Sequence, residues 1–320
     1  MWKFKPILKS TIWGGSRIIP FKRLDVRLDD VGESWEISGV PGMETVVESG
    51  LDAGLTVTQL VDKYGPALMG EKNYKKYGDD FPLLVKFIDA RAELSVQVHP
   101  DDALAQRRGH KWGKTEMWYI VEAAKGARIA SGFRTPVDPA DYDSLVESGR
   151  IEDVLGYIDV RPGEVYMTPA GRVHAIGRGC FLVEIQQTSD LTYRIYDYHR
   201  RDSEGKEREL HTELAREAID FNDTGVEAIP YQQRMNVPVT VARTPYFITN
   251  VLNADTDLLR DYSESDTFVI LVMVDGEAEI TCGSESVKAR RGQTLLVPAS
   301  ATGITITPVK TCRIIETYIK

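Results

Sequence analysis

The sequence predicts a mainly β protein that contains two β-barrels and a few short helices. Three observations support this fold class. Short runs of β-branched and aromatic residues alternate with Gly, Pro and Asp turns through most of the 320 residues, a pattern typical of antiparallel sandwiches and barrels. Helical patterns are few. In addition, one spacing of glycine and proline occurs twice, which indicates an internal repeat.

The predicted strands are short apolar runs bounded by turn residues. They cover residues 83–89, 94–99, 117–121, 164–169, 181–187, 192–198, 246–252, 268–280, 293–299 and 312–319. Three other segments predict helices. The first covers 55–68 and would be capped by Thr56 or Thr58, the second covers 139–155 as one or two short helices, and the third covers 212–219.

The repeat divides the chain into two units. The pattern Gly-x5-Pro occurs at residues 163–169 and again at 292–298. The first copy has more residues upstream of this pattern than the second copy has. The extra length is about that of the helical segment 139–155. We therefore expect two homologous barrels, which are residues 1–230, with helical insertions, and residues 231–320, with a reduced second copy.

Composition and charge limit the partners. Apolar residues make up 42% and charged residues 27% of the chain, as in ordinary globular proteins. The net charge of −9 argues against a nucleic acid or an anionic membrane as partner, although a local basic pocket for a small anion is compatible with it. We expect no signal peptide and no membrane span. Cys180, Cys282 and Cys312 are odd in number and far apart, which suits a reducing, cytoplasmic location.

The stretch AELSVQVHPDD at residues 92–102 is the first sign of chemistry. Because side chains alternate between the two faces of a strand, Ser95, Gln97 and His99 lie together opposite an apolar face. A glutamine oxygen and an imidazole nitrogen can then point at one metal ion. His174 ends the pattern G-x5-P-x-G-x2-H, which resembles the second sequence motif of the metal-binding cupin superfamily. Alone, either histidine would more often be a buried, hydrogen-bonded core residue.

A carboxylate should complete this set, and Glu116, at the start of the next strand, is the best candidate. Glu93 lies six residues from His99, and Asp101 and Asp102 follow a proline turn that they would cap. Two nitrogen and two oxygen donors without thiolate suit zinc, and also manganese, cobalt or iron. With one anionic ligand, a divalent ion stays positive and can polarise a substrate oxygen.

The first unit resembles type I phosphomannose isomerases over nearly its whole length. The resemblance rests on WGG at 13–15, GESWE at 32–36, PLLVKFIDA at 82–90, VQVHPDD at 96–102, KTEMW at 114–118 and EIQQTSDLTYR at 184–194. It implies a zinc-dependent enzyme with cupin-like jelly-roll barrels that interconverts mannose 6-phosphate and fructose 6-phosphate. It also implies one Zn²⁺ per chain, bound by Gln97, His99, Glu116 and His174, with Arg194 as the signature arginine.

Departures from the general cupin pattern support this narrower resemblance. The usual first motif has His-x-His, whereas this sequence has Gln97 before His99 and places Glu116 17 residues beyond His99. Phosphomannose isomerases share that departure. The chain has no room for the large helical domain of longer members, so it resembles the short bacterial form. In the second copy, Gly303 stands where His174 would fall, and we expect no metal there.

An aldose–ketose isomerase moves a proton between two carbons through an enediol, so it needs a base, an electrophile and a phosphate anchor. Lys86 lies in an apolar strand and would either pair with a carboxylate or become a neutral base through burial. Glu184 and Arg194 would either form a buried ion pair or act on the substrate. Which group is the base stays open. We expect catalytic roles for Arg194, Lys86 and Glu184, and substrate binding by Ser95, Lys114 and Asp190.

Three other functions compete with this one. A cupin oxygenase would use redox iron and usually more histidines. A sugar-phosphate sensor would keep the fold without turnover, and a related isomerase would use another substrate such as glucose 6-phosphate. We expect a small sugar phosphate as partner, no nucleic acid or membrane, and a monomer or weak homodimer.

Overall fold

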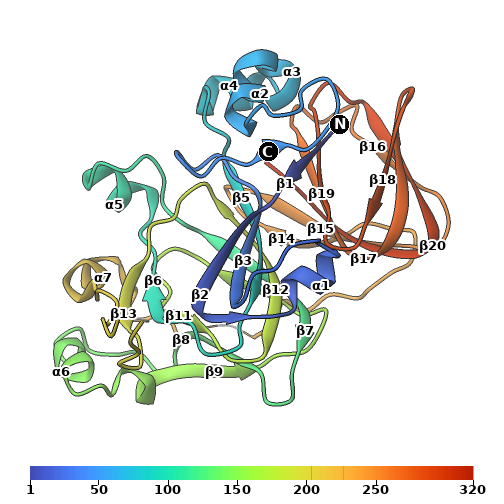
Figure 1. The fold of residues 1–320 in the computed structure, drawn as a ribbon. Coiled ribbons are helices and arrows are strands. Elements are labelled where there is room, and N and C mark those ends of the chain that lie inside the picture. The colour runs from blue at the N-terminus through green and yellow to red at the C-terminus, as the bar shows by residue number, and fades with distance from the viewer. Residues whose placement is uncertain (203, 226, 320) are drawn as a thin grey trace.

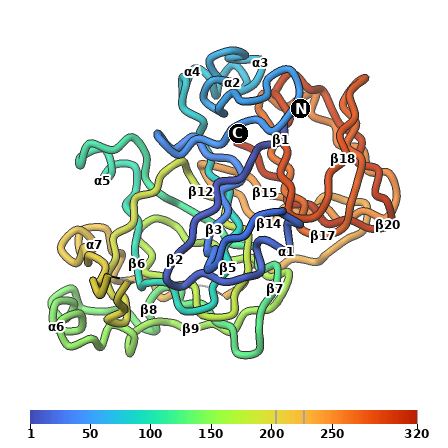
Figure 2. Tube along the Cα trace, in the orientation of Figure 1, coloured from blue at the N-terminus to red at the C-terminus, as the bar shows by residue number. Residues whose placement is uncertain are grey.

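The computed structural model describes residues 1–202, 204–225 and 227–319 and confirms a mainly β fold (Figure 1). Two sheets form most of the N-terminal unit, and a nine-stranded sheet forms most of the C-terminal one. Figure 2 shows the orange and red C-terminal strands gathered on one side of the green and yellow strands. Closure of either unit into a barrel stays a prediction, as does the domain boundary at residue 230.

One sheet of the N-terminal unit has six antiparallel strands in the order β10-β7-β12-β5-β3-β2. Its faces differ in polarity because side chains alternate along each strand. Val85 and Val183 join the apolar core that contacts the C-terminal unit, whereas Lys86 and Glu184 face the other way. The strands are β2 (Ile7–Gly15), β3 (Val31–Ile37), β5 (Leu83–Asp89), β7 (Glu116–Ala123), β10 (Val165–Thr168) and β12 (Cys180–Gln187).

The second sheet has five antiparallel strands in the order β13-β6-β11-β8-β9. It packs against the polar face of the six-stranded sheet, where the Trp118 ring meets the His174 ring edge-on at 5.5 Å. Its strands are β6 (Val96–Val98), β8 (Arg128–Phe133), β9 (Leu155–Asp159), β11 (His174–Ile176) and β13 (Tyr193–Tyr196).

The nine-stranded sheet follows the path β14-β15-β20-β17-β19-β1-β4, with β16 paired to β20 and β18 paired to β17. Long twisted hairpins built from β17, β18 and β20 supply most of it. The strands are β1 (Trp2–Lys5), β4 (Val46–Val47), β14 (Val239–Arg243), β15 (Ile248–Ala254), β16 (Leu258–Asp261), β17 (Val269–Cys282), β18 (Glu285–Arg290), β19 (Thr294–Val297) and β20 (Gly303–Tyr318).

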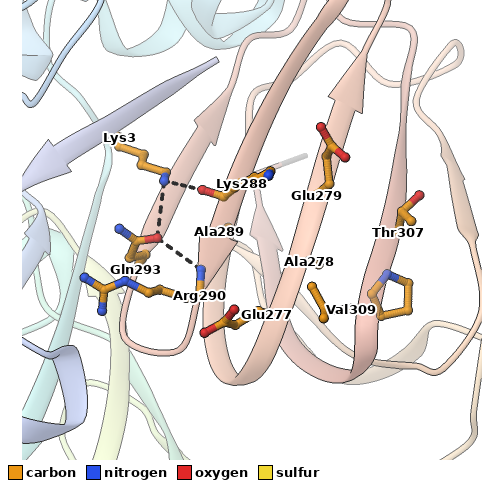
Figure 3. Close-up of a pocket in the computed structure, with 11 residues that line it drawn as sticks. Lys3, Glu277, Ala278, Glu279, Lys288, Ala289, Arg290, Gln293, Thr307 and Val309 are labelled. Carbon is orange, nitrogen blue, oxygen red and sulfur yellow. Dashed lines mark hydrogen bonds between the residues drawn. The ribbon is translucent and has the colours of Figure 1, made fainter.

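Strand β1 belongs to the C-terminal sheet, although its residues stand at the other end of the sequence. Trp2 pairs with Leu296 and Lys3 with Leu295 of β19. Figure 3 shows the Lys3 ammonium donating hydrogen bonds to the Lys288 carbonyl and, over 3.2 Å, to Gln293 at the edge of a surface pocket of about 470 Å³. The N-terminal end of the chain therefore contributes a strand to the sheet of the second unit, which the sequence pattern did not predict.

Helices connect the strands, and their caps explain where several begin. The predicted helix 55–68 is two helices separated at Gly65. Thr56 caps the first, because its side chain accepts from Gln59 N while the Gln59 side chain accepts from Thr56 N. The helices are α1 (Ile18–Lys22), α2 (Val57–Tyr64), α3 (Pro66–Met69), α4 (Glu71–Tyr77), α5 (Asp102–Arg107), α6 (Tyr142–Glu147), the 3-10 helix η1 (Ile151–Val154) and α7 (Thr212–Ala218).

The helices α6, η1 and α7 confirm the predictions for 139–155 and 212–219. By contrast, α1, α4 and α5 have no counterpart among the sequence predictions. Within the described residues, no helix combines the length and the apolar character that crossing a bilayer requires.

Candidate metal centre and active site

Three polar side chains lie in one row across the five-stranded sheet. Gln97 of β6 is opposite His174 of β11 on one side and opposite Arg194 of β13 on the other. Directly opposed residues of antiparallel strands point to the same face, so all three point toward the six-stranded sheet. His99 follows two residues after Gln97 and shares that face.

Glu116 approaches this row from the six-stranded sheet. It is the first residue of β7 and is fully buried. One donor atom from each of His99, Glu116 and His174 lies within 4.8 Å of the others. Each histidine Nε2 is 3.4 Å from a different oxygen of Glu116. The structure thus brings together three of the four predicted metal ligands around one carboxylate.

Backbone carbonyls orient both imidazole rings. His99 Nδ1 lies 2.8 Å from the Leu191 carbonyl oxygen, and His174 Nδ1 lies 2.9 Å from the Arg172 carbonyl oxygen. Each Nδ1 therefore carries the proton and donates it, which leaves the Nε2 lone pair directed at Glu116. Metal-binding histidines are commonly held by this arrangement.

The protonation states of the group suit a cation. Burial, reinforced by the Lys114 charge, lowers the pKa of His99 to about 3, and burial also lowers the pKa of His174. Burial alone would raise the pKa of Glu116, but Lys114 and the two histidines outweigh it and hold that pKa well below its usual value. Neutral imidazoles and an ionised carboxylate are the forms that bind metal ions.

The Glu116 carboxylate is the best test of whether a metal ion fits. Both of its oxygens are buried, and the groups nearest to them are the Lys114 ammonium, 2.9 Å from one oxygen, and the two histidine Nε2 atoms at 3.4 Å. A buried carboxylate needs a cation beside it, and Lys114 already supplies one, so the fit to a metal ion rests on the convergence of two neutral imidazoles and this carboxylate on one point. Two imidazole nitrogens with carboxylate oxygens suit zinc, as well as manganese, cobalt or iron. These residues fit a divalent metal ion.

Gln97 lies at the edge of the group. Its Nε2 donates to His174 Nε2 over 3.3 Å, while its Oε1 accepts from Ser95 Oγ over 3.3 Å. Rotating the amide by half a turn would exchange these two atoms and direct the oxygen toward the histidine, as metal binding requires. Ser95, which was expected to bind substrate, contacts the predicted fourth ligand.

Lys114 lies inside the predicted ligand set. Its buried ammonium is 3.1 Å from His99 Nε2 and 2.9 Å from a Glu116 oxygen. Sequence reasoning placed Lys114 only with the substrate-binding residues. The signal for its true position was available, because Lys114, Glu116 and Trp118 are two residues apart and share one face of an extended segment.

A second buried ion pair lies in the next row of the six-stranded sheet. Lys86 Nζ is 3.0 Å from Glu184, and Trp118 Nε1 donates to the other oxygen of Glu184 over 3.0 Å. Burial opposes the Lys86 charge, but Glu184 and Glu33 hold the pKa of Lys86 above its ordinary value. Lys86 is therefore a charged partner rather than a neutral amine. Because Glu184 pairs with Lys86, the alternative of an ion pair between Glu184 and Arg194 is wrong.

Glu184 lies close to the candidate metal ligands. It is opposite Trp118, whereas Glu116 is opposite Gln186, so the two glutamates are diagonal neighbours on one face. Burial and the Glu116 charge raise the pKa of Glu184 above its ordinary value, against the opposing effect of Lys86. Trp118, which contacts both Glu184 and His174, is a site residue that sequence reasoning missed.

Arg194 presents an unused donor to the same space. Its Nη1 donates to the Glu209 carbonyl over 2.8 Å. Its Nε is buried and has no hydrogen-bond partner among the described residues. Since Arg194 stands in the row of Gln97 and His174, this group is placed to bind a substrate oxygen.

Asp190 lies further out. It is exposed and lines a pocket of about 260 Å³ beside Leu191, whose carbonyl holds His99. Within the described residues, no hydrogen bond or ion pair joins its carboxylate to the other predicted site residues. Its part in substrate binding stays a prediction.

Comparisons with known proteins find relatives along the chain. The family described as "Phosphomannose isomerase type I, catalytic domain" matches residues 1–126, and "Mannose-6-phosphate isomerase, cupin domain" matches residues 241–319. The mannose-6-phosphate isomerase ManA of Bacillus subtilis is 33% identical over 298 residues, 92% of each chain. The mannose-6-phosphate isomerase of Streptococcus mutans is 31% identical over 288 residues, 90% of this chain and 89% of its own.

Solved structures are similar over the same extent. The crystal structure of the mannose 6-phosphate isomerase from Bacillus subtilis superposes with a TM-score of 0.84 at 28% identity and covers 99% of both chains. A putative mannosephosphate isomerase from Archaeoglobus fulgidus has a TM-score of 0.80 at 22% identity, covers 100% of this chain and 97% of its own, and supports the fold alone. The expectation of a cupin-like second unit agrees with the cupin domain matched at 241–319.

Proposed function

Because the chain belongs to the type I phosphomannose isomerases, we propose that it interconverts mannose 6-phosphate and fructose 6-phosphate and that one zinc ion assists it. One observation carries the proposal: the buried group of His99, Glu116 and His174, in which two neutral imidazoles and one carboxylate converge on a single point inside a protein of this family. The turnover assay below separates the isomerase from a non-catalytic sensor.

Gln97, His99, Glu116 and His174 would hold the metal ion. Bound there, it would polarise a substrate oxygen and so favour loss of the neighbouring carbon-bound proton. Lys114 would then lie beside the ion and add positive charge, which suits the binding of an anionic sugar phosphate.

The proton transfer belongs to the Lys86–Glu184 pair in this proposal. Glu184 takes the proton from C2 of the open-chain aldose and returns it to C1, while the hydroxyl proton passes from O2 to O1 through the enediol. The raised pKa of Glu184 makes it a stronger base than an exposed carboxylate. Lys86 keeps its charge and orients Glu184 through their 3.0 Å contact.

Arg194 would stabilise the negative charge that develops on the substrate oxygens, through the Nε group that has no protein partner among the described residues. Ser95, Lys114 and Asp190 stay as proposed contacts to the phosphate and the sugar hydroxyls.

The direct test is turnover before and after metal removal. The purified protein is assayed for conversion of mannose 6-phosphate into fructose 6-phosphate, stripped with a chelator and assayed again after zinc is restored. We expect activity to disappear on stripping and to return with about one zinc per chain. Activity that survives complete metal removal would contradict the metal assignment, and absence of turnover in metal-replete protein would contradict the isomerase.

A matched pair of histidine variants separates the site from general damage. His174→Ala should abolish zinc retention and turnover, whereas His199→Ala, whose side chain is 74% exposed, should leave both unchanged. Glucose 6-phosphate in the same assay distinguishes the proposed substrate from an alternative sugar phosphate.

A further inference from the structure

A cavity of about 660 Å³ opens at the end of the N-terminal unit that is remote from Glu116. Four turns enclose it, at residues 15–17, 89–93, 124–128 and 178–179. Strand β12 connects the two ends of the sheet: Gln186 is opposite Glu116, and Cys180 is opposite Ala123 beside the cavity. Six residues of extended chain place the cavity roughly 20 Å from the candidate metal centre.

Cationic side chains outnumber acidic ones in the lining of this cavity. Five cationic side chains line it, and only two of them have a carboxylate partner within 4 Å in the described part of the chain, namely Arg17 with Asp89 and Arg91 with Asp30. The other three, which are Lys125, Arg128 and Arg178, have none.

Carboxylates do not cancel this charge. Asp89 and Glu93 are the acidic residues of the lining. Asp89 forms an ion pair with Arg17 at 2.6 Å, and Glu93 is exposed. Outside the lining, Glu122 approaches Arg17 only to 3.9 Å. With Asp30 beside Arg91 and Glu122 near Arg17 included, five cations meet four carboxylates, so the net excess is one positive charge, and Lys125, Arg128 and Arg178 are the cations without a carboxylate partner among the described residues.

The floor and part of the cationic lining are held in place by the protein itself. Arg17 donates to Asp89 and to the Gly179 and Cys180 carbonyls at 2.7–3.2 Å. The Arg128 guanidinium stacks on Tyr157 at 4.0 Å from the ring centroid.

The turns of the floor are in close contact with one another. Gly179 has a φ of 89°, and a Cβ there would meet Ala124 Cβ at 2.8 Å. Main-chain bonds join Ala124 N to the Gly179 carbonyl over 3.1 Å and Gly179 N to the Ala90 carbonyl over 2.7 Å. A preorganised floor reduces the ordering cost of binding.

We propose that this distal cavity binds a small phosphate-bearing molecule, at a site separate from the catalytic one. Guanidinium and ammonium groups that lack carboxylate partners are the groups that recognise phosphate oxygens. The volume admits a ligand of the size of a sugar phosphate or a mononucleotide. A nucleic acid would need a basic stripe that follows a backbone, whereas these cations line a single open cavity.

Binding of inorganic phosphate to the metal-loaded enzyme, followed by ³¹P NMR titration, tests the proposal. The variant carries Lys125→Ala and Arg178→Ala, both at exposed positions. The control carries Arg27→Ala and Lys310→Ala, two exposed cations elsewhere, so that both proteins lose two positive charges. Competitive inhibition of isomerase turnover by phosphate gives a separate inhibition constant for phosphate binding at the catalytic site.

We expect wild type and control to bind phosphate with the same affinity at the distal cavity, and the variant to bind it at least tenfold more weakly, with kcat/KM and the inhibition constant unchanged. Equal affinity in all three proteins, or equal loss in variant and control, would overturn the proposal. A 20-nucleotide single-stranded DNA that binds through Lys125 and Arg178 while phosphate and glucose 6-phosphate do not would also overturn it, in favour of a nucleic-acid surface.

Discussion

At the scale of single residues, the site depends on where charges lie relative to Glu116. Lys114 is in contact with it, both histidines direct Nε2 toward it, and Glu184 lies diagonally beside it. Burial keeps both imidazoles neutral against the opposing effect of this carboxylate, and the same carboxylate helps to raise the pKa of Glu184. Changes at Glu116 should affect metal binding first, and changes at Glu184 should affect turnover alone.

Glu116→Gln should weaken zinc binding by more than about 100-fold, because losing a direct ligand exceeds the effect of losing an outer contact. The measurement is zinc per chain after dialysis against a competing chelator. Glu122→Gln is the matched control, since Glu122 lies on the same strand with its side chain 51% exposed. Equal zinc content in the two variants would show that Glu116 is not a ligand.

Glu184→Gln should lower kcat by about 10²–10⁴-fold with zinc content unchanged, as expected for a general base. Exchange of the C2 hydrogen of mannose 6-phosphate with solvent, followed by NMR, should slow by the same factor. A kcat within about twofold of wild type would exclude Glu184 as the proton carrier, and concurrent loss of zinc would make its role structural.

The residues of the site were more predictable than their contacts. His99, His174 and Glu116 could be predicted because motif spacing and strand alternation are written in the sequence. The partner of Glu184 could not, because cross-strand register decides it: Lys86 is opposite Glu184, whereas Arg194 is in the other sheet. Turn geometry and the packing of two sheets set that register, and neither is a local property.

At the scale of elements, the best predictions were strands with one clear apolar face. The predicted strand 83–89 coincides with β5, whereas β8 was missed because Ser131 and Gly132 interrupt its apolar pattern.

The turn after β13 is a further element that no strand pattern describes. There, Asp197 is buried and accepts from Arg208 over 2.7 Å, and it also pairs with Arg200.

That turn should make stability depend on pH. Burial alone would raise the pKa of Asp197, but Arg208 and Arg200 hold it below its ordinary value of 3.8. A carboxyl whose pKa is lower in the folded state stabilises the fold above the unfolded pKa, and this contribution is lost as pH falls through the folded pKa. Asp197→Asn should therefore cost about 1–3 kcal/mol at pH 7 and progressively less below pH 3.8.

Urea unfolding of wild type and Asp197→Asn at pH 7, 5 and 3 measures this difference, with the exposed Asp257→Asn as control. A difference that stays constant down to pH 3 would mean that Asp197 acts through packing rather than charge.

At the scale of the whole molecule, the two units share their interior. Val85 and Ile270 come from different units but belong to one apolar core, and the Phe81 and Phe268 rings lie 4.8 Å apart. A buried lysine, Lys22, also joins them. It lies 2.7 Å from the Glu36 carboxylate and donates to the Gly292 carbonyl. The internal repeat reveals two units, but it carries no information about residues that cross between them.

Strand β1 is the clearest such crossing, and its removal should affect the C-terminal sheet. Replacing residues 1–5 by a single Met removes the partners of Leu295 and Leu296 and the buried Phe4 ring, whose loss alone costs about 3–5 kcal/mol. Hydrogen exchange should show lost protection at β19 and β4 and retained protection at β14 and β15. The exposed Lys5→Ala is the control, and unchanged exchange at β19 would contradict a structural role for β1.

The same pairing has a consequence for the chain while it is being made. Ribosomes add about 5–20 residues per second, so residues 2–3 emerge about 15–60 s before residues 295–296, with which they pair. During that interval β1 can pair with β4, at Phe4–Val47 and Lys5–Val46, but not with β19. The pairing of β1 with β19 is therefore a late, long-range step that waits for nearly the whole chain.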